Sequence, residues 1–161
     1  MTDDPIMRSV QPVEPAYRSV LRLRALIFWL PLFAGALVAD RMLLSDLPVS
    51  GLLPALVGAI ALSGLIVAPD RIYRRLGYAI DDGLLRTVRG WLFYTDTIVP
   101  FVRVQHIDVA RGPIDKMFGT ATLVVHTAGT HNSIVTLPGL SPDRASEIRE
   151  SIRALIRADA E

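Results

Sequence analysis

An uncharged run of 22 residues, 47–68, limits what this chain can fold into more than any other stretch. A helix of that length is roughly 33 Å long, and the hydrocarbon core of a bilayer is about 30 Å thick. Pro54, Gly51, Gly58 and Gly64 would weaken a helix in water, but membrane helices tolerate such residues when neighbouring groups satisfy the freed backbone. The run therefore predicts a membrane span.

A shorter apolar run lies at residues 25–39 and ends at a polar cluster that begins with Asp40. The guanidinium groups of Arg22 and Arg24 can reach the headgroups, which lets a span extend over these positions. A signal peptide competes with this interpretation, but no Ala-x-Ala cleavage site follows the run. The two runs predict a transmembrane helical hairpin over residues 20–69, with spans at about 22–44 and 47–68.

Arginine is distributed unevenly around this hairpin. Only Arg41 lies between the runs, whereas seven arginines flank them: Arg8, Arg18, Arg22, Arg24, Arg71, Arg74 and Arg75. Because basic residues are retained on the cytoplasmic side, we expect a multi-pass protein of the inner cell membrane with both termini in the cytoplasm. The absence of cysteine fits that reducing compartment. Residues 1–19 hold three prolines and few apolar side chains, and they are expected to form an irregular cytoplasmic tail.

After residue 70 the sequence changes to short runs rich in Val, Ile, Thr, Tyr and Phe, separated by Gly, Pro and Asp. This spacing is typical of antiparallel strands, which are expected at residues 75–80, 84–91, 93–101, 103–110, 121–127 and 133–137. Ser141 is a natural N-cap for a closing amphipathic helix with Pro142 at its first position. Residues 70–161 therefore predict an all-β small barrel or sandwich capped by a C-terminal α-helix.

Two local irregularities are also expected within this β-rich region. Asp81-Asp82-Gly83 has the composition of a tight hairpin turn in which glycine supplies a positive φ. Within residues 102–109 the apolar positions change parity, so a regular strand would send them to opposite faces. A β-bulge near Gln105 or His106 would bring them to one face. Residues 111–120 are expected to form a turn-rich connection.

The order of short motifs in residues 85–141 resembles the bacterial pleckstrin-homology (PH) domain in its membrane-anchored, YdbS-like subtype. The motifs are Leu85-Arg86 with Arg89-Gly90, Ile98-Val99-Pro100 with Arg103-Val104-Gln105, Gly112-Pro113-Ile114-Asp115-Lys116 through Gly119, Thr122-Leu123-Val124-Val125, Thr127-Ala128-Gly129, and Leu137-Pro138-Gly139-Leu140-Ser141. Lys116 stands where the family more often has Arg, and Val104 where it has Ile. Two preceding membrane spans are usual in this subtype, so the resemblance covers nearly the whole chain after the N-terminal tail.

The resemblance implies a binding scaffold rather than an enzyme. The PH fold binds lipids, peptides or proteins, and a fold alone does not determine its ligand. Family members have no established enzymatic activity and look like modules of membrane-associated assemblies, often beside a larger protein that carries several copies of the domain. A second PH-like protein is therefore one partner that the resemblance implies.

The residues themselves give no sign of catalysis, a metal or a cofactor. His106, His126 and His131 lack metal-ligand spacing, and no nucleophile elbow, phosphate-binding loop or dinucleotide fingerprint occurs. On strands, His106 and His126 are expected to be partly buried or cross-strand polar residues. A chain without cysteine has no thiol nucleophile. The net charge of +1 does not favour nucleic-acid binding. We expect no enzyme activity, no cofactor and no nucleic-acid partner.

The basic residues carry most of the functional content and form the candidate lipid- or partner-binding set. Its members are Arg71, Arg74, Arg75, Arg86, Arg89, Arg103 and Lys116. Retention of basic residues on the cytoplasmic side is enough to explain Arg71, Arg74 and Arg75. The need for a soluble domain surface can explain the others. The sharper hypothesis is that Arg86, Arg89 and Lys116 gather at the membrane-facing end and contact anionic headgroups.

Three functions are compatible with this sequence. The first is a non-enzymatic scaffold or adaptor for a membrane protein assembly at the cytoplasmic face. The second is an anionic phospholipid-binding module with the same architecture. The third is an accessory subunit of a membrane enzyme or transporter, in which Gly51, Gly58 and Gly64 pack against partner helices.

Overall fold

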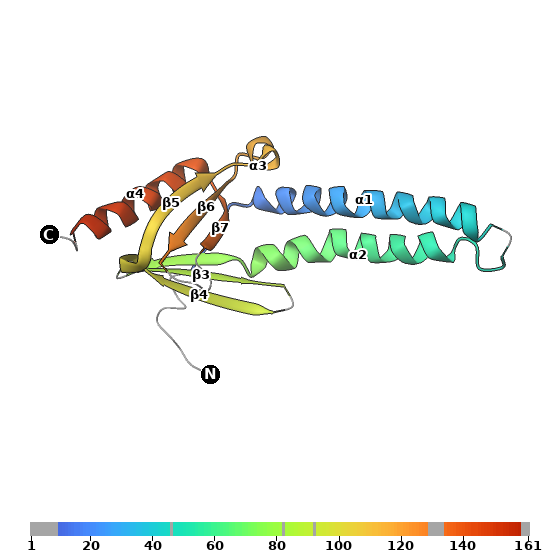
Figure 1. Cartoon of the computed structure of the whole chain (residues 1–161), viewed down its shortest axis with the longest axis horizontal. Helices are drawn as coiled ribbons and strands as arrows, with labels where there is room; N and C mark the ends of the chain where they lie inside the picture. Colours follow the sequence, from blue (N-terminus) through green and yellow to red (C-terminus); the bar gives the residue numbers. More distant parts are fainter. Residues whose placement is uncertain (1–9, 46, 82, 92, 129–133, 159–161) are drawn as a thin grey trace. The chain divides into compact units, whose positions relative to one another are not determined.

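The structure, a computed structural model, describes residues 10–158 except 46, 82, 92 and 129–133. The chain forms two compact units (Figure 1). Arg18–Arg71 make up one unit, and the described residues up to Tyr17, together with those from Ile72 onward, make up the other. The first unit is helical, and the second contains the strands and the last two helices.

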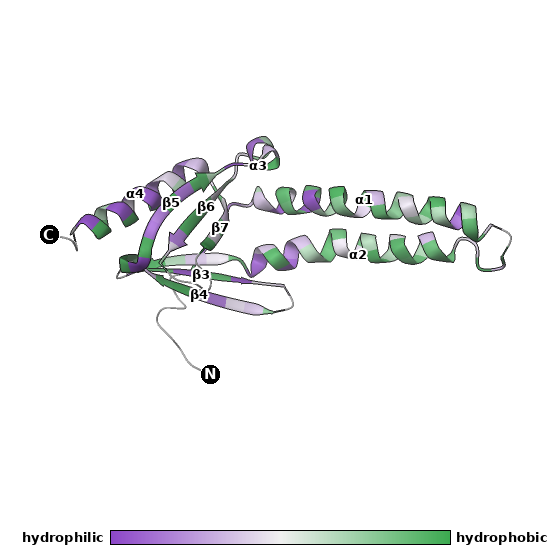
Figure 2. Cartoon of the chain, viewed as in Figure 1, coloured by the Kyte–Doolittle hydropathy of each residue, from purple (hydrophilic) through white to green (hydrophobic). Residues whose placement is uncertain are grey.

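The helical unit consists of two antiparallel helices, α1 (Tyr17–Leu43) and α2 (Leu52–Arg74). At one end Arg22 Nη2 lies 3.3 Å from Asp70 Oδ1. At the other end the Gly51 amide donates to both carboxylate oxygens of Asp40, at 2.9 and 3.0 Å. Both helices are long and apolar enough to cross a membrane, yet only 6% and 11% of their apolar windows are buried. A core helix of a soluble protein would be mostly buried, so the helix surfaces match lipid as solvent (Figure 2).

The helix limits differ from the apolar runs for local reasons. Residues 47–51 form tight turns that end at Gly51, whose φ is +87°, and α2 therefore begins at Leu52 rather than at residue 47. At its other end α2 continues past the apolar run to Arg74, because arginine and tyrosine are compatible with a helix outside the hydrocarbon. Asp40, expected in the turn, lies in the last turn of α1, where its carboxylate accepts the Gly51 amide.

The second unit contains two antiparallel sheets. The first has the order β1-β2-β3-β4, with β1 at Gln11–Pro12, β2 at Gly77–Asp81, β3 at Leu84–Gly90 and β4 at Tyr94–Pro100. A 3₁₀ turn, η2 (Phe101–Arg103), leads to the second sheet, β5-β6-β7, formed by Val104–Ala110, Ala121–Thr127 and Ile134–Leu140. The closing helix is α4 (Pro142–Ala158), and its start is confirmed by the Arg144 amide, which donates to Ser141 Oγ at 3.2 Å.

The core lies between these sheets and α4. Its fully buried side chains include Leu85 of β3, Leu123 of β6, Leu137 of β7, and Ile148 and Ile152 of α4. The last two recur at helical spacing, as the sequence predicts for the apolar face of the closing helix. The all-β domain with a capping C-terminal helix is confirmed.

The irregularities fall close to their expected positions. The pairing of β5 with β6 shifts between Val104 and His106, which confirms the bulge. Gly83 has a φ of +76° in the turn after β2, whereas Asp82 lies outside the described residues. The connection after β5, which the sequence predicts to be turn-rich, contains a short helix, α3 (Pro113–Met117). The buried Asp115 carboxylate stabilises it by accepting the Gly112 amide and the Thr120 hydroxyl, each at 3.1 Å.

The sequence predicts that the segment before α1 is irregular. The structure differs, because part of this segment is a strand. Gln11 and Pro12 pair with Tyr78 and Gly77, and thus form the edge of the first sheet. The Glu14 amide donates to the Gly139 carbonyl at 2.7 Å. A strand of two residues has no readable periodicity, which explains why the sequence gives no sign of it. The helical hairpin is consequently an insertion between two neighbouring strands of one sheet.

Candidate binding surface

The basic residues predicted as a binding set are placed in several separate positions. Arg71 and Arg74 lie exposed in the last turns of α2, and Arg75 follows directly. Arg103 ends η2 immediately before β5, whereas Lys116 lies on α3, after the other end of β5. Seven residues of strand span roughly 23 Å, so these last two cations do not share one site.

Two members of the set are engaged in contacts within the domain. Arg86 of β3 forms a bidentate ion pair with Asp96 of β4, with the Arg86 Nε 2.9 and 3.0 Å from the two carboxylate oxygens. Arg89 Nη1 donates to Thr136 Oγ1 of β7 at 3.3 Å. The hypothesis that Arg86, Arg89 and Lys116 act together on headgroups therefore requires Arg86 to leave a carboxylate that already balances its charge.

A groove lies between β5 and the C-terminal half of α4 in the second unit. Its volume is about 250 Å³, and its lining is Val104, Gln105, His106 and Ile107 of β5 with Arg153, Ile156 and Arg157 of α4. Ile107 is buried, whereas Gln105, His106 and both arginines are exposed. The groove thus has an apolar floor with amide, imidazole and guanidinium groups at its rim.

The strand that forms one wall of this groove is at the edge of its sheet. In the described part of the chain β5 pairs with β6 alone. An edge strand presents unpaired amide and carbonyl groups that another extended chain can take up. The groove therefore combines backbone hydrogen-bonding groups with two guanidinium groups. The sequence predicts the strand and the helix but gives no sign that Arg153 and Arg157 come to lie beside β5.

A second polar cluster lies next to the groove. His106 and His126 are cross-strand partners whose ring centroids are 5.9 Å apart. Asp108 lies 2.8 Å from the Nε2 of His106 and 3.6 Å from that of His126. The cross-strand position expected for both histidines is confirmed, while His131 lies outside the described residues. Among the residues the structure describes, no group of three metal-ligating side chains is placed to hold an ion.

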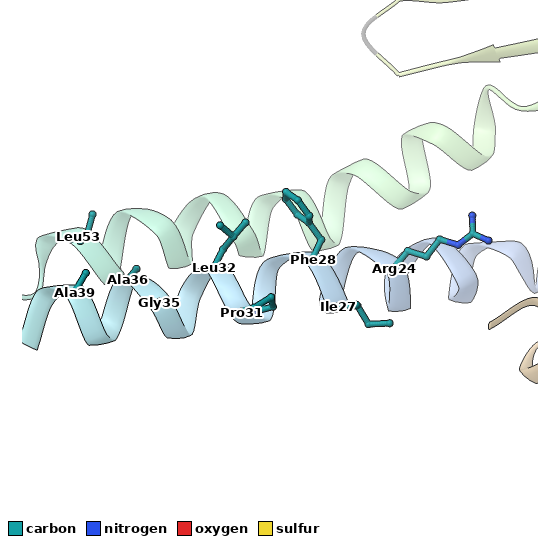
Figure 3. A pocket seen from close by; sticks show the side chains of 9 residues that line it. All are labelled: Arg24, Ile27, Phe28, Pro31, Leu32, Gly35, Ala36, Ala39 and Leu53. Atoms are coloured by element: carbon teal, nitrogen blue, oxygen red, sulfur yellow. The ribbon is translucent and has the colours of Figure 1, made fainter. Parts of the chain in front are cut away.

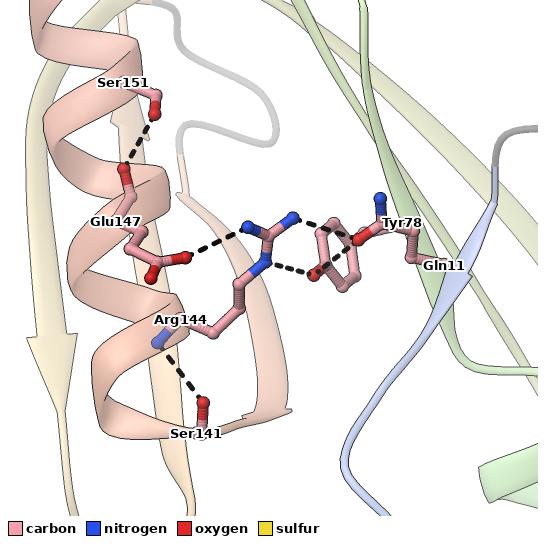
Figure 4. Close-up of polar contacts among 6 residues, drawn as sticks. All are labelled: Gln11, Tyr78, Ser141, Arg144, Glu147 and Ser151. Atoms are coloured by element: carbon pink, nitrogen blue, oxygen red, sulfur yellow. Dashed lines mark hydrogen bonds and ion pairs between the residues drawn. The ribbon is translucent and has the colours of Figure 1, made fainter.

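A hydrogen-bond network sets the position of α4, and hence of the groove wall, against the first sheet (Figure 4). Arg144 donates from Nε to Tyr78 Oη at 3.1 Å, from Nη2 to Gln11 Oε1 at 3.0 Å, and from Nη1 to Glu147 Oε2 at 3.1 Å. The hydrogen bonds to Tyr78 and Glu147 raise the pKa of Arg144 above its usual value, against an opposing effect of burial. The guanidinium is therefore a permanently charged link between β1, β2 and α4.

Two of the three glycines expected to pack against partner helices, Gly58 and Gly64, instead face α1 inside the hairpin. A Cβ added to Gly58 would lie 3.1 Å from the Phe33 ring, and one added to Gly64 would lie 2.9 Å from Trp29 Nε1. A Cβ at Gly35 would have nothing within 4 Å, because this residue lines an open apolar groove along α1 (Figure 3). Small residues of α2 thus make room for the aromatic rings of α1, and Gly51 lies in the turn.

Comparisons with known proteins agree on one family. The family described as "Bacterial PH domain" matches residues 25–156, which include most of the hairpin as well as the strands β2 to β7. The chain is 35% identical over 105 residues to the "UPF0699 transmembrane protein YdbS" of Bacillus subtilis (strain 168), a match that covers 63% of this chain and 64% of that protein. The match thus spans a little less than two thirds of the relative's length. No solved structure matches the chain.

Proposed function

Since the chain belongs to the bacterial PH domain family, we propose that this membrane protein is a non-enzymatic adaptor that holds a protein partner at the membrane surface. The groove between β5 and α4 is the observation that carries the proposal. It offers an open strand edge, an apolar floor at Ile107, and the guanidinium groups of Arg153 and Arg157 at its rim. An extended segment that carries acidic side chains matches all three features.

The membrane anchor makes weak binding in such a groove effective. A domain tethered to a bilayer meets other proteins of the same membrane at a high effective concentration, so a modest contact area is sufficient for assembly. The proposed partner is a membrane protein, with a second PH-like protein as one candidate. The flanking arginines support a placement of both termini, and thus of the groove, in the cytoplasm.

Photo-crosslinking in intact membranes tests the adaptor role. The full chain carries benzoylphenylalanine at Gln105 in the groove or, as a control, at the exposed Asp143 in the first turn of α4. We expect a discrete crosslinked product from the groove position alone. The product should be lost when Arg153 and Arg157 are both replaced by Glu, and it should persist in Arg149→Glu, which reverses a charge on α4 outside the groove. Equal crosslinking from both positions, or no effect of the groove charges, would contradict the proposal.

Anionic phospholipid is the second candidate ligand, favoured by the grouping of Arg71, Arg74 and Arg75 at the end of α2. Each cation near an anionic surface contributes about 1 kcal/mol, and salt screens this attraction. Lipids that copurify with the full chain distinguish the two candidates. Enrichment of anionic lipid that falls in an Arg71→Gln, Arg74→Gln, Arg75→Gln variant would favour the lipid role, whereas unchanged lipid content together with intact crosslinking would favour the adaptor.

A further inference from the structure

The turn between β3 and β4 presents exposed aromatic side chains. Trp91 is 48% exposed, Phe93 is 84% exposed and Tyr94 is 57% exposed. Elsewhere on these strands Leu85, Val88 and Val99 are buried, whereas Leu84 and Ile98 are exposed. The turn is tight, because a Cβ added to Gly90 would lie 2.6 Å from the Phe93 carbonyl oxygen. Only glycine fits there without displacing the backbone, so the aromatic side chains are held at the tip of a closed hairpin.

This tip lies beside the residue that follows the second membrane helix. Val88 pairs with Gly77, the first residue of β2, so β3 extends past the start of β2 and back toward the end of α2. Arg75, one residue after α2, donates from Nη1 to the Trp91 carbonyl at 2.9 Å. The tip is thereby bonded to the point where the chain leaves the helix.

The distance along α2 places that point at the membrane surface. The uncharged run ends at residue 68 and α2 ends at Arg74, six residues later. Six residues of helix measure about 9 Å. The headgroup region of each leaflet is roughly 5–8 Å thick. Arg75 and the tip bonded to it therefore emerge near the outer limit of the headgroups.

We propose that the β3–β4 tip, made of Trp91, Phe93 and Tyr94, inserts into the headgroup region of the leaflet in which α2 ends. Tryptophan and tyrosine are enriched at this depth because their rings combine an apolar body with a polar group. Arg75 is hydrogen-bonded to the tip, Arg89 pairs with Thr95 beside it, and residues 89–95 hold no acidic side chain. The charge around the aromatic residues is thus complementary to an anionic bilayer surface.

The inserted tip gives the domain a second attachment to the bilayer, independent of the helical hairpin. Two attachments, one covalent and one through the tip, hold the domain in one orientation relative to the membrane plane. The groove between β5 and α4 would then have a fixed orientation relative to the membrane plane. The inference depends on the membrane location of the chain and stands whether or not the adaptor proposal holds.

The absence of cysteine makes a direct depth measurement possible in the full chain. A nitroxide is attached at Phe93→Cys and, as a matched control, at Val102→Cys, and each protein is reconstituted into phosphatidylethanolamine and phosphatidylglycerol vesicles. Val102 is 79% exposed, comparable with Phe93, but follows the other end of β4, roughly 23 Å along the strand. Power saturation compares collisions with oxygen, which partitions into lipid, and with a water-soluble nickel chelate.

We expect the ratio of oxygen to nickel accessibility to be several-fold higher at Phe93→Cys than at Val102→Cys. Equal ratios would overturn the proposal, because the tip would then lie in water. Protection of Phe93→Cys from both reagents would also overturn it, since that result indicates burial against protein.

Trp91 fluorescence in a Trp29→Phe chain provides a second readout. Brominated lipid should quench this fluorescence strongly, and aqueous acrylamide should quench it weakly. The reverse pattern would refute insertion.

Discussion

The helical hairpin and the β domain use the same apolar residue types in opposite ways. In the hairpin Leu30 and Leu62 are 61% and 59% exposed, and the polar contacts lie at its two ends. In the domain Leu123 and Leu137 have no exposed surface. The difference shows that the solvent, lipid or water, determines whether a leucine stabilises by facing outward or by being buried. It also predicts that equivalent substitutions have different effects in the two regions.

The largest effect is expected from core truncation in the domain. Leu123→Ala leaves a cavity among fully buried neighbours and should lower the free energy of unfolding by about 3 kcal/mol. Leu30→Ala is the matched change on the hairpin and should cost well under 1 kcal/mol, because Leu30 faces lipid. Denaturation of the full chain in nanodiscs, followed by near-ultraviolet circular dichroism, measures both. Similar losses for the two variants would contradict the contrast.

A smaller effect tests whether the N-terminal residues up to Tyr17, the first residue of α1, belong to the domain. Gly139 has a φ of +79°, and a Cβ there would lie 2.7 Å from the Tyr17 ring, so Gly139→Ala should cost about 2 kcal/mol. Gly119→Ala is the control, because φ is +66° but nothing lies within 4 Å of an added Cβ. Its cost should be limited to the backbone term of about 1 kcal/mol. Equal melting temperatures for the two variants would show that Tyr17 does not pack on Gly139.

The Arg144 network is expected to contribute about 1 kcal/mol. Arg144→Met removes hydrogen bonds to Tyr78, Gln11 and Glu147 at once, whereas Arg149→Met removes one exposed contact with Glu150 and should be nearly neutral. Urea titration of both variants measures the difference.

The pH dependence of that contribution follows from the raised pKa of Arg144. A raised folded-state pKa stabilises the fold at every pH below the unfolded value, and that stability is lost only as pH rises through the folded value. The difference between the wild type and Arg144→Met should therefore stay constant from neutral pH to about pH 10. A decline within that window would show that another group controls the network.

The smallest effect concerns packing within the hairpin. Gly64→Ala forces the Trp29 indole to shift by a few tenths of an ångström, whereas Gly35→Ala adds a methyl group in open space. We expect Gly64→Ala to cost less than about 1 kcal/mol and to change the emission of Trp29 in a Trp91→Phe chain. Gly35→Ala should leave the emission unchanged. A response from Gly35→Ala alone would indicate that a partner helix covers the open groove of α1.

The sequence predicts an element of the fold where the hydrophobic pattern is long or where the residues of a turn or helix cap are distinctive. The 22-residue apolar run, Gly83 in its turn, and Ser141 as N-cap each act through local sterics or hydrogen bonding. The bulge between Val104 and His106 could also be predicted from the sequence. The apolar positions of this strand change parity, and a β-bulge brings them back to one face. The short strand β1 and the helix α3 could not be predicted, since both depend on contacts with distant or buried partners.

The candidate sites divide in the same way. The cluster Arg71, Arg74 and Arg75 is local in sequence, so its position at the end of α2 follows from the apolar run before it. The groove could not be anticipated, because Arg153 comes to lie beside Gln105 only after α4 packs against β5. The ion pair of Arg86 with Asp96 likewise depends on the register of β3 with β4.

The sequence alone thus indicates two apolar helices, the family and the succession of strands from β2 onward, because these depend on hydrophobic length, turn residues and motifs that act over a few positions. Only the tertiary structure decides that the hairpin is inserted between two paired strands, with Pro12 opposite Gly77. It also decides that Arg75 meets the carbonyl of Trp91 at the β3–β4 tip. Such pairings join residues far apart in the chain, and their free energy comes from burial and hydrogen bonds that no local pattern encodes.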